Sequence, residues 1–185
     1  MVKMNLNKIN SKKLVLSGLF IAIGLVLPSI TMQIPSIGNM LCPMHIPVIL
    51  AGFICGAPYG LVVGFVVPLL RSVTFGAPPL MPIATAMAFE LATYGLVSGI
   101  MYNRVKDKKI GVYISLITAM ILGRAVWGVV SYGLFTALGN QFTWQLFMMQ
   151  AFVNAIPGII IQLVFIPILV IKIKVGEARR ISYGR

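Results

Sequence analysis

Three charged side chains stand inside stretches of sequence that are otherwise apolar. Glu90 lies in MAFELATYGLVSG, and Arg71 and Arg124 lie in neighbouring apolar stretches, although the chain has only three acidic residues in all. A carboxylate or guanidinium group costs about 2.5–3.5 kcal/mol at the centre of a membrane span unless it pairs or faces water. A glutamate at such a position therefore indicates an ion pair, a polar cavity, or both.

The composition of the chain indicates the class of protein that holds these charges. Of its 185 residues 59% are hydrophobic and 10% are charged, and the mean hydropathy is +0.99. A soluble domain of this length needs more charge to cover its surface. In lipid, helices satisfy their backbone hydrogen bonds within one segment. We therefore expect an all-α integral membrane protein with a single membrane domain, residues 1–185.

Six apolar segments predict a compact bundle of six transmembrane helices. A helix needs about 20 apolar residues to cross a hydrocarbon core of about 30 Å. The second and third segments are short and are separated by the Gly/Pro turn CGAPYG, which predicts a helical hairpin with one leg that spans incompletely. The predicted segments run approximately over 13–29, 43–56, 58–74, 81–102, 110–137 and 145–172.

The net charge of +12 predicts an orientation in the membrane. Thirteen of the fifteen basic residues cluster in or beside the N-terminus (1–12), the loop after the fourth segment and the C-terminal tail (173–185). If six spans alternate, all of these face one side, and the positive-inside rule places both termini in the cytoplasm. The patches lack a soluble scaffold, so nucleic acid is not an expected partner. The opposite loops, 30–42, 75–80 and 138–144, contain no basic residue.

Several other functions lack the sequence features that they require. The first segment is followed by no small-x-small cleavage site, so it is not expected to be a signal peptide. Cys42 and Cys55 lie near opposite ends of the second segment, too far apart for a disulfide, and no metal-ligand spacing of Cys and His was recognised. Walker A, H-E-x-x-H and G-x-S-x-G motifs are missing. We therefore expect no enzyme, metal or cofactor, and no ATP hydrolysis by this chain.

Counting residues along the helices predicts that Glu90 and Arg124 meet. Glu90 lies about nine residues, or roughly 14 Å, from the outer end of the fourth segment at 1.5 Å per residue. Arg124 lies about thirteen residues, or roughly 20 Å, from the outer end of the fifth. Because segment ends are uncertain by a few residues, the two can reach a similar depth. Arg71 is expected above them, closer to the outer surface.

Further polar side chains recur at helical spacing in the same half of the bundle. His45 begins the second segment, and the uncharged loop 30–42, with Gln33 and Asn39, is expected to lie over the cluster. Pro157 loosens the sixth segment. The three helix faces are Glu90, Thr93, Tyr94 and Val97 on the fourth segment, Arg124, Trp127, Gly128 and Ser131 on the fifth, and Gln150, Asn154, Gly158 and Gln162 on the sixth.

These residues allow two interpretations. One is a small-molecule pocket that opens to the outside. The other is a structural ion pair with amides that hold helices together, with Tyr94 and Trp127 as core packing and His45 as a structural histidine. The concentration of polar groups in one half favours the pocket, and the excess of arginine over glutamate favours a substrate with a carboxylate or phosphate. The candidate lining residues are His45, Arg71, Glu90, Tyr94, Arg124, Trp127, Gln150 and Asn154.

Two pairs of small residues predict close helix contacts. Gly18 and Ala22 in the first segment, and Gly60 and Gly64 in the third, follow small-xxx-small spacing. We expect Gly60 and Gly64 to pack within the bundle. Gly18 and Ala22 have a second use, which depends on the resemblance described next.

A six-span protein with cytoplasmic termini resembles the substrate-binding subunit, or S component, of an energy-coupling factor (ECF) vitamin transporter. The segment HIPVILAGFICGAPYGLVVGFVVPLLRSVTFGAPPLMPIATAMAFELATYGLVSG (45–99) carries most of the resemblance, which covers essentially the whole chain. In that family an A-x-x-x-A motif on the first span docks onto the coupling membrane subunit. Gly18 and Ala22 occupy this pattern here, with glycine in place of the first alanine.

The resemblance implies a multi-pass protein of the bacterial plasma membrane that binds a vitamin near the outer surface. It also implies two kinds of partner, a coupling transmembrane subunit and two cytosolic ATPase subunits, which supply the energy. Arg71 and Arg124 would bind anionic or carbonyl groups of the substrate, while His45, Gln150 and Asn154 would bind its hydroxyls or amides. Glu90 would orient Arg124 and contact the substrate, and Tyr94 and Trp127 would form apolar walls.

No ligand-specific signature selects one vitamin, although the basic excess favours a carboxylate such as pantothenate. Pyridoxine-like and pyrimidine compounds remain open. Two other classes of function also remain open. One is a small homo-oligomeric channel or autonomous carrier, although no internal repeat of the kind that carriers use is recognised. The other is a structural membrane adaptor without a ligand.

Overall fold

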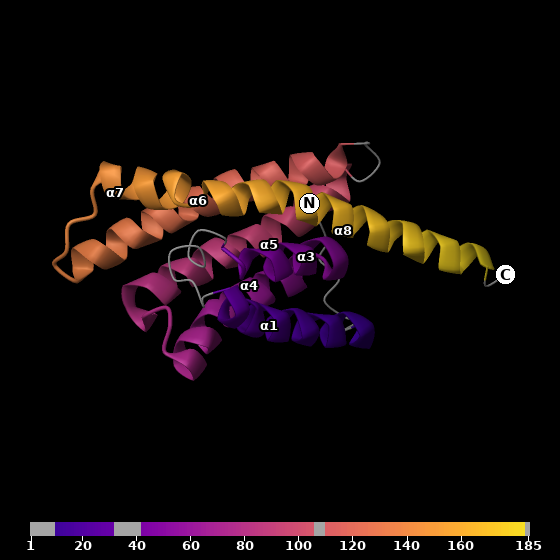
Figure 1. Cartoon of the computed structure of the whole chain (residues 1–185), viewed down its shortest axis with the longest axis horizontal. Helices are drawn as coiled ribbons and strands as arrows, with labels where there is room; N and C mark the ends of the chain where they lie inside the picture. Colours follow the sequence, from indigo (N-terminus) through magenta and orange to yellow (C-terminus); the bar gives the residue numbers. More distant parts are fainter. Residues whose placement is uncertain (1–9, 32–41, 106–109, 184–185) are drawn as a thin grey trace.

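The structure is a computed structural model that describes residues 10–31, 42–105 and 110–183, with side chains described as far as residue 173. Within these residues every regular element is helical, which confirms the predicted all-α class (Figure 1). The elements are α1 (Ser11–Thr31), α3 (His45–Cys55), α4 (Ala57–Phe75), the irregular turn η1 (Leu80–Ala84), α5 (Thr85–Val105), α6 (Gly111–Ala137), α7 (Trp144–Met148), the irregular turn η2 (Met149–Val153) and α8 (Ile156–Tyr183).

The lengths of these helices fit a membrane-spanning bundle. In the described part of the chain, five segments are long and apolar enough to cross a membrane, and α3 is a shorter apolar helix. With 11 residues, α3 is about 16 Å long at 1.5 Å per residue, so the expected incomplete leg of the hairpin is the second segment. The third segment, expected to be short, is the 19-residue helix α4.

The helix α3 forms the centre of the bundle. It packs against α1, α4, α5 and α8, and nine of its eleven residues are buried. Val48, Ile49 and Ala51 are completely shielded in the main apolar core, with Leu91 of α5 and Leu116 of α6. An apolar helix enclosed by its neighbours does not need to span the bilayer, because protein rather than lipid surrounds its ends.

Small residues bring α3, α4 and α5 into close contact. A Cβ atom on Gly64 would overlap the backbone of Leu91, and one on Gly60 would meet the backbone of Gly95. Helices in lipid associate through this kind of close packing, because burial from water does not drive them together. The expectation that Gly60 and Gly64 pack within the bundle is confirmed. Cys42 and Cys55 are not joined by a disulfide.

The sixth predicted segment is one continuous apolar stretch but not one regular helix. α7 and η2 are separated from α8 by a turn at residues 154–155. Pro157, in the first turn of α8, has no backbone N–H and its ring opposes a preceding helical turn, which explains why the helix restarts here. α8 packs against α3 and α6, and its C-terminal turns extend beyond the other helices (Figure 1).

Candidate functional site

A cavity of about 510 Å³ lies at the end of the bundle where α1 and α4 end and α3 and α5 begin. We call it the polar cavity because three charged or titratable side chains with 3% exposure or less, His45, Arg71 and Glu90, reach its wall. Its lining residues are Pro28, Cys42, Pro43, Met44, His45, Arg71, Ala77, Pro78, Pro79, Ile83, Met87, Glu90, Arg124, Trp127, Gln150 and Asn154.

An ion pair between α5 and α6 forms part of the cavity wall. Arg124 Nη1 lies 3.0 Å from Glu90 Oε1, and the exposed fractions of the two side chains are 10% and 2%. The prediction that these residues meet at a similar depth is confirmed. Because both also line the cavity, the ion pair and the pocket are not alternatives: the same two residues form both.

Two further side chains surround the same carboxylate oxygen. Tyr94, one helical turn after Glu90, donates its hydroxyl to Glu90 Oε1 at 3.0 Å. His45 Nε2 lies 3.7 Å from Oε1, and the His45 ring packs 5.3 Å from that of Tyr94. Neither ring nitrogen of the buried His45 has a hydrogen-bond partner within the described residues. An unsatisfied buried donor or acceptor on a cavity wall is a group that a bound molecule can satisfy.

Arg71 connects α4 to the end of α1. Its Nη1 donates to the carbonyl oxygen of Leu25 and to Ser29 Oγ (3.2 Å), and its guanidinium lies 5.0 Å from the centre of the Phe75 ring. The side chain is buried and lines the polar cavity beside Pro28. Arg71 therefore holds two helices together at the site, in addition to contributing positive charge.

The remaining candidate lining residues of α6 and the sixth segment, Trp127, Gln150 and Asn154, also reach the cavity. Trp127 is buried, and its ring lies 6.0 Å from that of Phe147 with an interplanar angle of 24°. Gln150 in η2 and Asn154 in the following turn line the opening and are exposed. The break before α8 therefore places two amide side chains at the cavity.

Seven of the eight predicted binding residues line the cavity, and Tyr94 does not. Tyr94 shares the helix face of Glu90, but it is 1% exposed and lies behind the carboxylate. Thr93 also falls outside the lining, and its hydroxyl donates to the Phe89 carbonyl of its own helix. The expected cover, loop 30–42 with Gln33 and Asn39, falls mostly outside the described residues.

Sequence reasoning did not identify the apolar wall of the cavity. Pro78, Pro79, Ile83 and Met87 form part of it, and the proline-rich stretch GAPPLMP was the available signal. Cys42, which is not among the candidate lining residues, also lines the cavity. Burial raises the pKa of the Cys42 thiol, and the neighbouring Arg124 opposes this effect only in part, so the thiol is neutral near pH 7.

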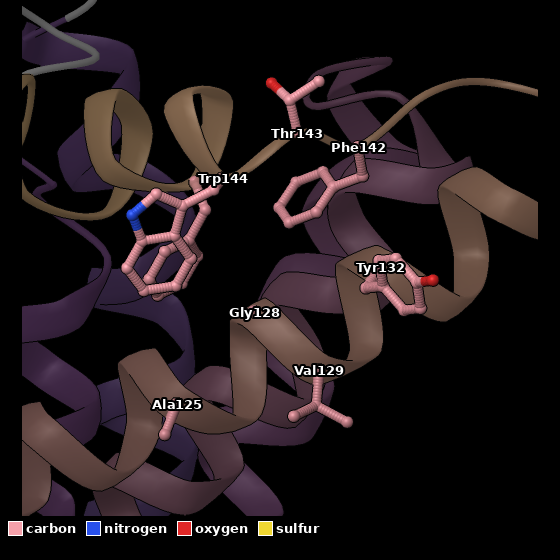
Figure 2. Close-up of a pocket in the computed structure, with 8 residues that line it drawn as sticks. Ala125, Gly128, Val129, Tyr132, Phe142, Thr143 and Trp144 are labelled. Atoms are coloured by element: carbon pink, nitrogen blue, oxygen red, sulfur yellow. The ribbon is translucent and has the colours of Figure 1, made fainter.

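A second hollow, the aromatic groove, has a different character. It has a volume of about 460 Å³ and lies between α6 and the segment that leads into α7. Figure 2 shows the rings of Tyr132, Phe142 and Trp144 around it, with Ala125, Gly128 and Val129 on α6. It contains no charged side chain, so the polar cavity is the better candidate for recognition of a water-soluble molecule.

The polar cavity combines several polar groups with apolar side chains. In the described residues, no group of three His, Cys, Asp or Glu side chains is arranged to hold a metal ion. The wall contains two guanidinium groups, one carboxylate, one imidazole and two amides, together with apolar side chains of proline, methionine and tryptophan. A few polar groups on an otherwise apolar concave surface are typical of small-molecule sites.

Comparison with known protein families gives a match over most of the chain. The family model described as "ECF transporter, substrate-specific component" matches residues 12–170. Neither a curated protein nor a solved structure matches the chain.

Proposed function

The chain belongs to the family of substrate-specific components of ECF transporters, and on this basis we propose which molecule it captures and how. A member of this family is a substrate-binding transport subunit of the plasma membrane and works with the other subunits of an ECF transporter. We propose that this chain captures a water-soluble vitamin or related micronutrient in the polar cavity. The observation that carries the proposal is the buried Glu90–Arg124 pair on the cavity wall.

The charges on the wall favour a substrate with a carboxylate. Arg71 and Arg124 contribute two positive charges, and Glu90 contributes one negative charge, so the three together leave a net charge of about +1 at neutral pH. An anionic group neutralises this excess, and guanidinium groups suit carboxylates because they can donate two parallel hydrogen bonds. Among the vitamins, pantothenate combines one carboxylate with hydroxyl and amide groups, which His45, Gln150 and Asn154 would bind.

The orientation and partners follow from the charge distribution and the family. Both termini face the cytoplasm in this proposal, which places the polar cavity on the outer side. A coupling transmembrane subunit binds α1, and two cytosolic ATPase subunits supply the energy that delivers the substrate inward. Gly18 and Ala22 are exposed on α1, and a Cβ atom on Gly18 would meet no neighbour within 4 Å among the described residues. This open surface supports their role in docking.

Uptake of labelled pantothenate tests the proposal. We expect cells that express the chain alone to take up almost none, and cells that also express a coupling subunit and both ATPases to accumulate it. The matched control carries ATPases without their Walker A lysine. Rapid uptake by the chain alone would instead identify an autonomous carrier or channel. Binding of no vitamin in any combination would leave the adaptor interpretation.

A further inference from the structure

Three side chains surround one carboxylate oxygen of Glu90, Oε1. Oε1 accepts the Tyr94 hydroxyl at 3.0 Å, and it lies 3.0 Å from Arg124 Nη1 and 3.7 Å from His45 Nε2. These three side chains come from α5, α6 and α3 respectively. Rotation of the carboxylate would disturb all three contacts, so its orientation is fixed by the bundle.

Tyr94 contributes to this arrangement from behind the cavity wall. It is 1% exposed and does not line the polar cavity, so a substrate in the cavity would not touch its hydroxyl. Gly123 of α6 makes room for the tyrosine ring, because a Cβ atom at that position would overlap it. The ring also supports His45, at 5.3 Å between centroids. Tyr94 is thus placed to act on a substrate only through Glu90 and His45.

We propose that Glu90 selects substrates that present an uncharged hydroxyl or N–H group to its second oxygen, Oε2, and that Tyr94 is the positioning residue that fixes this oxygen toward the cavity. An ionised carboxylate is an acceptor with about four lone-pair sites, so engagement of Oε1 leaves capacity on Oε2. Because Glu90 lines the cavity, a molecule bound there is the partner that we propose for Oε2. The inference rests on the proposed function and adds a rule for the substrate.

The hydrogen-bond donor on the substrate is an uncharged group because the cavity wall already has a net positive charge. With Arg71 and Arg124 against Glu90, the wall has a net positive charge, and a cationic group on the substrate would add to it. Like charges in a site of low dielectric constant repel strongly. The substrate is therefore an anion with a separate hydroxyl, amide or ureido N–H donor, and permanently cationic vitamins such as thiamine are excluded.

The test compares two ligands on three proteins. The ligands are pantothenate and a donor-free analogue with both hydroxyls replaced by hydrogen and the amide nitrogen methylated. The proteins are the full chain, its Tyr94→Phe variant and the control Tyr59→Phe. The control also removes one phenol hydroxyl, which accepts from the Asn10 backbone N–H at 3.3 Å and lies outside the cavity lining. Calorimetry on protein in lipid nanodiscs gives the dissociation constants.

We expect the unmodified chain to bind pantothenate at least about tenfold more tightly than the analogue, as for loss of one hydrogen bond to a charged group. Tyr94→Phe should lower the affinity for pantothenate about tenfold and leave the affinity for the analogue within about twofold of that of the unmodified chain. Tyr59→Phe should change neither affinity. A general loss of structure would weaken both ligands equally, and that result would overturn the positioning role. If the unmodified chain binds pantothenate and the analogue equally tightly, the proposed selection of donor-bearing substrates is wrong, whatever the variants show.

A thermal-shift panel of water-soluble vitamins separates failure of this inference from failure of the proposed function. If no vitamin stabilises the unmodified chain, the proposed function falls and the inference falls with it. Nicotinate and lipoate have a carboxylate but no neutral donor, and thiamine is a cation. If one of these three is the ligand, the inference is wrong but the proposed function stands. If a donor-bearing anion other than pantothenate binds, that vitamin and its donor-free analogue replace the first pair, with the same expected results.

Discussion

At the scale of single residues, the polar cavity depends on one carboxylate with three partners. The meeting of Glu90 and Arg124 was predictable because helix rise converts sequence position into depth, and both lie near the middle of their segments. The role of Tyr94 was not predictable from the sequence. Its i+4 spacing from Glu90 is compatible both with lining the cavity and with a hydrogen bond to the Glu90 side chain, and the structure shows the second. The contacts of Arg71 with Leu25 and Ser29 depend on which helices are neighbours, which local spacing does not encode.

The buried pair predicts a specific pattern of stability. Arg124→Gln leaves a buried carboxylate without its guanidinium, and Glu90→Gln leaves a buried guanidinium without its carboxylate. Each single change should destabilise the protein by about 3 kcal/mol, because a buried charge that loses its partner keeps its desolvation cost. The double variant should recover a large part of this loss. Thermal or denaturant unfolding in mild detergent measures all four proteins.

A double-mutant cycle decides whether this pair is coupled. If the effects of the two single variants simply add in the double variant, the residues do not form a coupled pair, and the account of the cavity wall is wrong. Binding is a separate readout of the same variants. Glu90→Gln should weaken pantothenate binding even if the fold is intact, because a side-chain amide is a weaker acceptor than a carboxylate.

At the scale of helices, the surroundings of each glycine distinguish internal packing from an exposed helix face. The spacing alone did not separate the two pairs, since Gly18–Ala22 and Gly60–Gly64 share the same pattern. The structure separates them by what surrounds each glycine. The break in the sixth segment was only partly predictable, because Pro157 indicates a disturbed helix but not how many turns precede it.

Leucine at each position should give opposite results. Gly64→Leu should lower the melting temperature strongly, because the added side chain meets the backbone of Leu91 and drives α4 from α5. Gly18→Leu should leave the melting temperature and vitamin binding nearly unchanged, because the space beside Gly18 is open. It should however reduce co-purification with the coupling subunit several-fold. If the Gly18→Leu variant co-purifies with the coupling subunit as well as the unmodified chain does, the coupling subunit does not dock on α1 at Gly18.

At the scale of the whole molecule, the polar cavity lies at one end of an apolar bundle. The topology predicted from the sequence places most of the basic residues on the opposite side of the membrane. Composition was sufficient to predict the class, because a chain with 10% charged residues has few ways to cover a soluble surface. It was not sufficient to predict the shape of the cavity. That shape depends on α3 being short and central and on the proline-rich turn before α5.

The central claim is that the polar cavity holds a small molecule. The most direct measurement is mass spectrometry of the compounds released from the chain after growth in rich medium and purification in mild detergent, with Glu90→Gln as the matched control. We predict about one equivalent of a vitamin-like anion from the unmodified chain and much less from the variant. An equal amount from both proteins would contradict the role of Glu90. No compound from either, together with no thermal shift for any vitamin, would contradict the claim itself.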